Sequence, residues 1–200
     1  MICGAAFAAM ATPAAAQQGT EVTEIVVTGS RIVRQDYVAT SPIATVTGEA
    51  TVANADVTLD TYLNTLPQVN PAASSTSNNP SNGGRSTVDL RGLGANRNLV
   101  LVDGRRPMVS ANNLTVDLNT IPQAMIENVE VITGGAGATY GADAIAGVVN
   151  LRLKRNFEGV DFRASYSNST EYWDAEEYQF QGVIGGNFAD GRGNAIFGFD

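Results

Sequence analysis

Three segments between residues 160 and 200 alternate between apolar and polar side chains. Because successive side chains of a strand point to opposite faces, the alternation predicts three strands that share one apolar face. A short connection, Asp190-Gly191-Arg192-Gly193, and a longer polar loop at residues 168–176 join them, so we expect an antiparallel sheet. The positions of the apolar parity, small residues included, are Val160, Phe162, Ala164, Tyr166, Tyr178, Phe180, Gly182, Ile184, Gly186, Phe188, Ala195, Phe197 and Phe199.

Two kinds of protein use such a sheet. Strands of about ten residues with aromatic residues near their ends, joined by alternating short and long connections, are typical of an outer-membrane β-barrel. In the alternative, a soluble protein packs the apolar face of the sheet against its core. Three strands cannot close a barrel, and the sequence stops at Asp200 within a predicted strand, so the barrel hypothesis expects further strands beyond it.

The first residues of the chain predict a signal peptide. Residues 1–16 are apolar and rich in alanine, and Ala14-Ala15-Ala16 before Gln17 fits an A-x-A cleavage site. The usual basic region is missing, which leaves a disordered alanine-rich tail as the alternative. Secretion favours the barrel hypothesis.

The composition argues against several kinds of site. The chain has 12 Lys and Arg against 20 Asp and Glu, a net charge of −8, so it lacks the basic surface expected of a nucleic-acid-binding protein. It has no His, the most common general base and metal ligand, and its one cysteine, Cys3, lies within the predicted signal peptide. We therefore expect no catalytic residue, no metal site, no cofactor and no nucleic-acid partner.

Residues 37–155 predict a small α+β domain. Leu59, Leu63 and Leu66 share one face of a helix, and Asp103-Gly104 is a hairpin turn signal. We expect strands at residues 42–46, 87–91, 98–102, 128–133 and 148–153, short helices at residues 47–55, 59–66 and 121–126, and loops at residues 70–86 and 107–118.

A glycine-rich run at residues 134–147 lies between two of these strands. A phosphate-binding loop needs a lysine or a helix N-terminus after its glycines, but the next basic residue is Arg152, inside the following strand. We therefore interpret the glycines as backbone devices for tight turns and close packing. They are Gly134, Gly135, Gly137, Gly141 and Gly147.

A β-prone segment, Glu24-Ile25-Val26-Val27-Thr28-Gly29-Ser30, has no strand next to it in the sequence. An isolated strand carries unpaired N–H and C=O groups, so it can pair with another chain. The alternative is an ordinary edge strand of the domain that follows. The residue pattern alone leaves both possibilities open.

Motifs that follow one another along the chain resemble those of the TonB-dependent outer-membrane receptors. The segment at residues 24–31 resembles the TonB box, and Gly137-Ala138-Thr139-Tyr140-Gly141-Ala142-Asp143-Ala144-Ile145-Ala146-Gly147-Val148-Val149-Asn150 resembles the closing signature of the plug domain. Between them, the segments similar to successive plug motifs are Leu63-Asn64-Thr65-Leu66-Pro67-Gln68-Val69, Leu90-Arg91-Gly92-Leu93-Gly94, Val100-Leu101-Val102-Asp103-Gly104 and Ile126-Glu127-Asn128-Val129-Glu130-Val131-Ile132.

This resemblance implies an α+β plug domain followed by the first strands of an antiparallel transmembrane β-barrel. The implied divisions are a signal peptide at residues 1–16, the TonB box and a linker at 17–36, the plug at 37–155 and the start of the barrel at 156–200. The glycine-rich run would then be the compact end of the plug, a hinge before the barrel.

The resemblance also implies a function. The protein would lie in the bacterial outer membrane in contact with its lipid, and it would take up a scarce or large nutrient while the plug gates the barrel lumen. TonB, energised by its inner-membrane complex, would pair by strand addition with the box, which lies in the periplasm. The residues implied to bind TonB are Glu24, Ile25, Val26, Val27 and Thr28.

Individual plug residues receive roles by the same resemblance. Arg91 is similar to an arginine that pairs with barrel carboxylates, and Asp143 either caps nearby N–H groups or pairs with a plug arginine. Asp103 and Gly104 are expected to form a turn. The two loops that would face the outside supply the candidate substrate contacts Asn78, Asn79, Asn82, Arg85, Met108, Asn112 and Asn113.

Two other classes of protein compete with the uptake receptor. A passive or structural outer-membrane protein, such as a porin or adhesin with a plug-like domain, would not need the TonB box. A soluble secreted enzyme would bring acid and base residues together in a cleft, whereas the carboxylates here are dispersed along the sequence. The substrate stays open among siderophores, vitamin B12, glycans and peptides.

Overall fold

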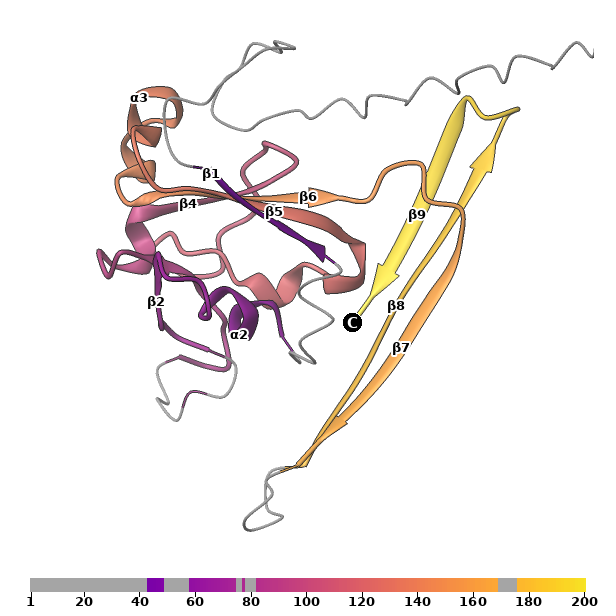
Figure 1. The fold of residues 1–200 in the computed structure, drawn as a ribbon, viewed down its shortest axis with the longest axis horizontal. Helices are drawn as coiled ribbons and strands as arrows, with labels where there is room; N and C mark the ends of the chain where they lie inside the picture. The colour runs from indigo at the N-terminus through magenta and orange to yellow at the C-terminus, as the bar shows by residue number, and fades with distance from the viewer. Residues whose placement is uncertain (1–42, 49–57, 75–76, 78–81, 169–175) are drawn as a thin grey trace, which may run out of the picture.

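The computed structural model describes residues 43–48, 58–74, 77, 82–168 and 176–200. They form a globular domain and a three-stranded sheet that stands beside it, connected by the segment after strand β6 (Figure 1). The predicted signal peptide, the TonB box and its linker, and nearly all of the helix expected at residues 47–55 lie outside the described residues.

A mixed four-stranded sheet forms the centre of the globular domain. It consists of β1 (Ile43–Thr47), β5 (Ile126–Ile132), β6 (Gly147–Leu153) and β4 (Asn98–Val102), in the order β1-β5-β6-β4. Neighbours run antiparallel except β4 and β6, which are parallel. These strands confirm the ones predicted from their apolar sequences.

Both faces of this sheet are covered, and successive residues of a strand belong to different apolar clusters. One face packs Val149 and Leu151 of β6 against α2 (Leu59–Leu63) and the small sheet of β2 (Val69–Asn70) and β3 (Asp89–Leu90). The other face packs Val148 against the region of α3 (Ala136–Tyr140) and the 3-10 turn η4 (Ala142–Ala144). A sheet covered on two sides explains why β4 and β6 carry consecutive apolar residues.

Two expectations for this domain need correction. Asp103-Gly104 does form a tight turn, with one β-bridge between Val102 and Arg105, but no hairpin strand follows it, because β4 pairs with β6 instead. The glycine-rich run is a helical connection between two strands of one sheet, so it is not a hinge between domains. Its α3 and η4 fold back over the sheet that they connect.

The remaining helical segments are short. They are the 3-10 turns η1 (Ala95–Arg97), η2 (Leu118–Thr120) and η3 (Gln123–Met125), the last of which falls where one helical turn was predicted. Within the described parts of the chain, no helix combines the length and the apolar character needed to cross a membrane.

The predicted three-stranded sheet is confirmed. It consists of β7 (Gly159–Ser167), β8 (Glu177–Phe188) and β9 (Gly193–Phe199), all antiparallel and in that order. The register pairs Phe162 with Gly182 and Ile184 with Phe197, so positions of the same parity share a face across all three strands. The apolar face is exposed, whereas Gln181 and Val183 on the opposite face of β8 are buried.

Candidate functional site

A buried polar cluster connects the interiors of two strands with the turn that follows a third in the globular domain. Asn150 in β6 is 1% exposed; its Nδ2 donates to Glu130 Oε2 in β5 (3.0 Å), and its Oδ1 accepts from the Gly104 N–H after β4 (2.9 Å). Burial raises the pKa of Glu130, and the hydrogen bond from Asn150 and the charge of Arg152 partly oppose this rise. The amide therefore holds a carboxyl group and a turn at fixed positions.

Asp103, beside this cluster, closes the turn onto the end of β6. Its Oδ1 accepts from the Leu153 N–H (3.3 Å) and lies 3.9 Å from Arg152 Nε and 3.7 Å from Arg155 Nη2. The expected turn at Asp103 and Gly104 thus has partners about fifty residues away in the sequence. These contacts connect the end of β4 to the segment that leads to the three-stranded sheet.

Two glycines of the glycine-rich run are required for different reasons. Gly141 has φ +95° and open space around it, so a side chain there meets only backbone strain. Gly147 has φ +153°, and a Cβ on it would overlap Ile132 O and lie 2.6 Å from Leu90 Cδ1. The run therefore serves packing, and its five-residue helix α3 is too short to act as an anion site.

The same run carries one exposed ion pair. Arg106 Nη1 donates to Asp143 Oδ2, and Arg106 Nη2 donates to Tyr140 O (3.3 Å). Of the two roles expected for Asp143, the pairing with an arginine is the one observed. Both side chains are about half exposed, so solvent screens the pair and its contribution to stability is small.

The first candidate substrate loop is partly held by its own hydrogen bonds. Asn82 is buried, and its Nδ2 donates to Ser74 O and Arg85 O (both 2.8 Å), while Arg85 Nε donates to Asn82 O (2.8 Å). The side chain of Asn82 is therefore a structural support, and Arg85 is the more accessible of the two. Asn78 and Asn79 lie outside the described residues.

The second candidate loop is connected to the first at its base. The Leu118 N–H donates to Ser86 O (2.9 Å), and Asn119 Nδ2 donates to Gly84 O (2.9 Å). Met108, Asn112 and Asn113 are all exposed on this loop. The structure thus places the bases of both loops together.

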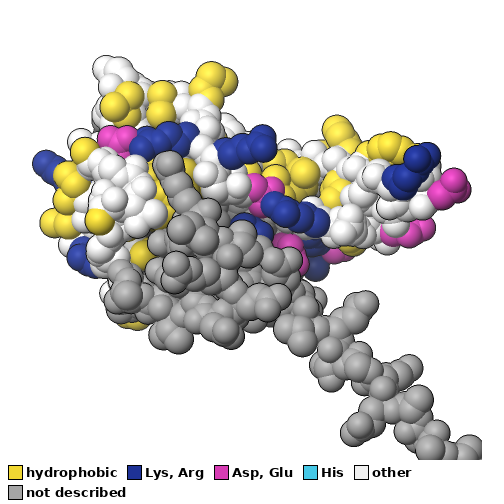
Figure 2. All heavy atoms as spheres, turned by 90° about the horizontal axis from the view of Figure 1, so that it is seen from above, with side chains coloured by type: hydrophobic (Ala, Val, Ile, Leu, Met, Phe, Trp, Pro, Cys, Tyr) yellow, Lys and Arg dark blue, Asp and Glu magenta, His cyan; other side chains and the backbone are white. Residues whose placement is uncertain are grey.

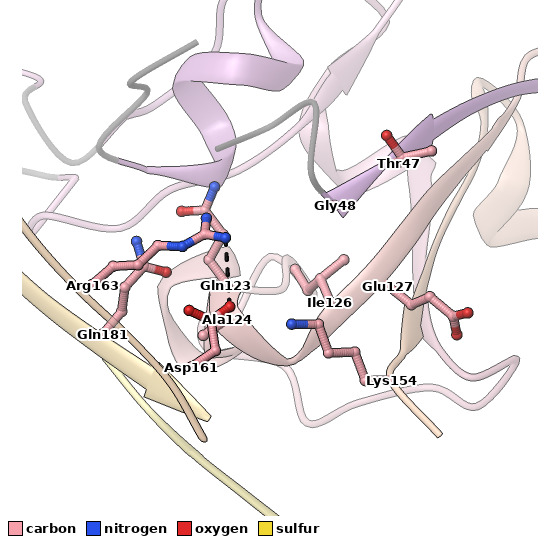
Figure 3. A pocket seen from close by; sticks show the side chains of 10 residues that line it. All are labelled: Thr47, Gly48, Gln123, Ala124, Ile126, Glu127, Lys154, Asp161, Arg163 and Gln181. Carbon is pink, nitrogen blue, oxygen red and sulfur yellow. Dashed lines mark hydrogen bonds and ion pairs between the residues drawn. The ribbon is translucent and has the colours of Figure 1, made fainter. Parts of the chain in front are cut away.

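A cavity of about 320 Å³ lies between the globular domain and the three-stranded sheet and is lined by residues of both. Figure 3 shows Asp161, Arg163 and Gln181 reaching from β7 and β8 toward Gln123 of the globular domain. Arg163 Nη2 lies 3.5 Å from Asp161 Oδ2. Thr47, Gly48, Glu127 and Lys154 line the remaining wall of the cavity.

Basic and acidic side chains are interspersed on the face of the molecule that Figure 2 shows. Figure 2 shows Lys and Arg scattered among acidic and apolar side chains on the visible face rather than gathered in one patch. Among the described residues, no group of three or more His, Cys, Asp or Glu is arranged to hold a metal ion. The features that remain as candidates for function are the two loops and the contact with the three-stranded sheet.

A comparison with family models decides the identity of the globular domain. The model described as "TonB-dependent Receptor Plug Domain" matches residues 36–148, which is more than half of the chain. The chain belongs to this family. The globular domain is accordingly the plug, with mixed helices and strands, and the family is one of outer-membrane receptors and not of enzymes.

Solved receptors share the fold. The siderophore receptor PirA from Pseudomonas aeruginosa matches with a TM-score of 0.56 and 24% identity, over 77% of this chain and 27% of its own. A variant of the ferric enterobactin receptor PfeA from Pseudomonas aeruginosa gives a TM-score of 0.57 and 25% identity, over 75% of this chain and 23% of its own. The ferric yersiniabactin uptake receptor FyuA from Yersinia pestis gives 0.52 and 22%, over 76% and 22%. This chain spans about a quarter of the length of these receptors.

Arg91 lies at the end of β3 in the plug. It is exposed, it has φ 61°, and its N–H donates to Gln68 O (2.9 Å). None of the ion pairs recorded between described residues includes Arg91. Its contact with a barrel carboxylate stays a prediction, as do the TonB contacts of residues 24–28.

The sequence interpretation missed the buried cluster of Glu130 and Asn150 and the polar side chains of the cavity. A signal for the first existed, because each residue is a polar side chain with apolar residues on both sides of it in a strand. Such a residue needs a buried partner, and two of them in neighbouring strands are natural partners. Gln123 and Gln181 carried no such signal, because they lie in a turn and on the polar face of a strand.

Proposed function

We propose that this chain forms the plug and the first wall strands of an energised uptake receptor in the bacterial outer membrane. In this proposal, β7, β8 and β9 belong to the wall of a transmembrane β-barrel, the plug fills its lumen, and TonB pulls on the box at residues 24–28. The protein binds its substrate on the outer side and releases it toward the periplasm when the plug yields.

The orientation of the three-stranded sheet is the observation that carries the proposal. A soluble protein would pack the apolar face against the domain, but Val160 is 71% exposed and Phe197 67% exposed, while Val183 on the polar face is fully buried beneath the plug. A large exposed apolar surface on a sheet with a polar inner face is what a lipid-facing barrel wall requires. This arrangement is also the reason to reject the soluble secreted enzyme.

The connections and lengths of the strands support the same assignment. A transmembrane strand needs about 9–11 residues, and β7 has 9 and β8 has 12. The turn between β8 and β9 is short, whereas the connection between β7 and β8 is longer. Alternating short and long connections are usual in outer-membrane barrels.

The energised step rests on the box and on the position of β1. β1 is an edge strand whose recorded ladder is with β5 alone, and it follows the box in the chain. A force applied to the box would therefore reach a strand held by one neighbour. Because strand addition uses main-chain hydrogen bonds, the backbone of residues 24–28 matters more than their side chains.

For the substrate we propose a large, scarce, iron-carrying compound of the siderophore class. The solved receptors that share the fold are described as receptors for siderophores, ferric enterobactin and ferric yersiniabactin. Within this proposal Arg85, Met108, Asn112 and Asn113 are the described plug residues that contact it. Vitamin B12, glycans and peptides are the other substrate classes that the uptake test must include.

The experiment is uptake by the full receptor with a Val26→Pro substitution, which removes one backbone donor in the middle of the box. We expect uptake of labelled substrate, and growth that depends on it, to be abolished. Gln18→Pro, outside the box, is the matched control and should transport normally. If the Val26→Pro receptor transports as well as wild type, the energised function is wrong and the passive outer-membrane protein is preferred.

A further inference from the structure

The plug touches the three-stranded sheet, hereafter the wall, chiefly through the turn η3. This turn contacts both β8 and β9. A Cβ built on Gly198 of β9 would overlap the Cγ and Sδ atoms of Met125, and it would lie 3.5 Å from Pro122 Cβ. The methionine therefore occupies the space that any side chain at position 198 would need.

The backbone that carries Met125 is fixed on the plug side. The Met125 N–H donates to Pro122 O (3.0 Å), and Met125 O accepts from the Lys154 N–H (2.8 Å). The next residue, Ile126, is buried in the plug core. The end of this turn is thus rigid, and the unbranched side chain of methionine is suited to fill an irregular gap beyond it.

The wall side of the contact is formed by residues of the inner face. Gly198 pairs with Val183 of β8, which is fully buried. Glycine weakens a strand, because it loses entropy and offers no side chain to pack, so a close approach of another group is a common reason for it. Gly186 offers a comparison, because it lies in the same sheet with open space around its Cβ position.

Beside this apolar contact lies the cavity of Figure 3, whose lining includes the polar side chains of Gln123 and Gln181. Gln123 of η3 is 4% exposed and Gln181 of β8 is 6% exposed. Both side-chain polar atoms of Gln123, and Oε1 of Gln181, have no hydrogen-bond partner among the described residues. Buried amides of this kind require partners, and water in a cavity of this size beside them is the simplest one.

We propose that Met125 and Gly198 form the seat that fixes the plug against the wall, next to a cavity filled with water that hydrogen-bonds Gln123 and Gln181. This inference rests on the proposed function, because it takes β7, β8 and β9 as the barrel wall. An apolar contact beside water defines the resting position and still separates easily, since water replaces the polar contacts as the plug moves.

The test uses the full-length receptor in the outer membrane of cells that lack TonB, so that the measurement does not depend on energised uptake. Gly198→Val should push η3 from the wall and raise passive entry of a large antibiotic such as vancomycin, on the order of tenfold or more, as overpacking of a tight contact predicts. Gly186→Val is the matched control and should leave entry unchanged. Equal entry through the two variants would overturn the proposal.

A second arm separates the seat from a general folding defect. Met125→Ala leaves the wall intact and should also raise entry, by less than Gly198→Val. The double variant, Met125→Ala with Gly198→Val, should admit less antibiotic than Gly198→Val alone, because the new side chain fills the space that the methionine leaves. The proposal would be contradicted if Met125→Ala left antibiotic entry unchanged, or if the double variant admitted as much antibiotic as Gly198→Val.

The outcome is separable from failure of the uptake function. Barrel assembly is checked for each variant by its outer-membrane level and by its heat-dependent migration on a gel, and if Gly198→Val does not assemble, Met125→Ala carries the test. A Val26→Pro receptor that transports normally would refute the energised function while leaving the leak measurements intact. Conversely, normal TonB dependence with no effect of Met125→Ala would refute the seat alone.

Discussion

The plug sheet and the wall sheet bury opposite kinds of side chain. In the plug, Val148 and Val149 are both fully buried although they point to opposite faces, because helices and loops cover the sheet on two sides. In the wall, Phe180 is 57% exposed and its neighbour Gln181 is 6% exposed. The comparison teaches that the plug sheet buries apolar side chains inside the molecule, whereas under the proposed function the low-dielectric surroundings of the wall lie outside it.

The largest effect is expected from Gly147→Val, which tests how tightly the plug sheet is packed. Backbone strain at φ +153° and overlap with Ile132 O and Leu90 together cost about 4 kcal/mol of plug stability. Gly141→Ala, where only strain acts, should cost about 1–2 kcal/mol. Thermal unfolding and limited proteolysis of the receptor measure both, and similar losses in the two variants would contradict the packing argument.

The wall is tested by Ile184→Arg, near the middle of β8 on the exposed apolar face. A surface residue in water would tolerate this change, but in lipid an arginine near the midplane costs about 2–4 kcal/mol. Folding of the receptor into lipid vesicles gives the free energy, with Asn187→Arg on the polar face as the control. If Ile184→Arg folds as stably as wild type, the exposed face does not contact lipid and the comparison fails.

The buried cluster of the plug is tested by Asn150→Leu. The substitution leaves Glu130 and the Gly104 N–H without their partner, which costs about 1–3 kcal/mol for each unsatisfied group. We expect the melting temperature of the plug to fall while the wall keeps its own transition. If only the melting temperature of the wall fell, Asn150 would instead support the contact between the plug and the wall.

The smallest effect is expected from Glu130→Gln. Because the pKa of Glu130 is raised in the folded plug, its contribution to stability is fully present below its ordinary value near 4.5 and is lost as the pH rises through the folded pKa. The glutamine keeps an acceptor for Asn150 and carries no charge. The variant should therefore be more stable than wild type at neutral pH and equal to it in acid, as measured by plug melting at pH 4 and pH 7.5. A gain that does not depend on pH would contradict the role of the charge.

Much of the fold could be predicted because its signals are local. The strict alternation at residues 160–199 predicts three strands, and the structure has them in register, because each side chain of a strand must take one of two faces. The turn at Asp103-Gly104 was predicted from its residue types. The helix in the glycine-rich run was not, because Ala136 and Ala144 are held by packing against Val148 and not by helix propensity alone.

The candidate site was predictable only in part. The pairing of Asp143 with a plug arginine was expected as one of two roles, and the structure identifies that arginine as Arg106. The support given by Asn82, the pairing of Glu130 with Asn150 and the amides of the cavity depend on contacts between distant segments. No local pattern in the sequence specifies such contacts.

The sequence by itself determined the order of the main strands and the faces of the wall strands, because periodicity and turn chemistry act over a few residues. The family was indicated separately, by the resemblance of successive motifs. Only the tertiary structure decided that β4 pairs in parallel with β6, that Asn150 joins β5 and the turn after β4, and that the polar face of the wall lies toward the plug. It also decided which glycine of the wall, Gly198, faces Met125. These features arise from packing between segments far apart in the chain, where shape and burial select the partner.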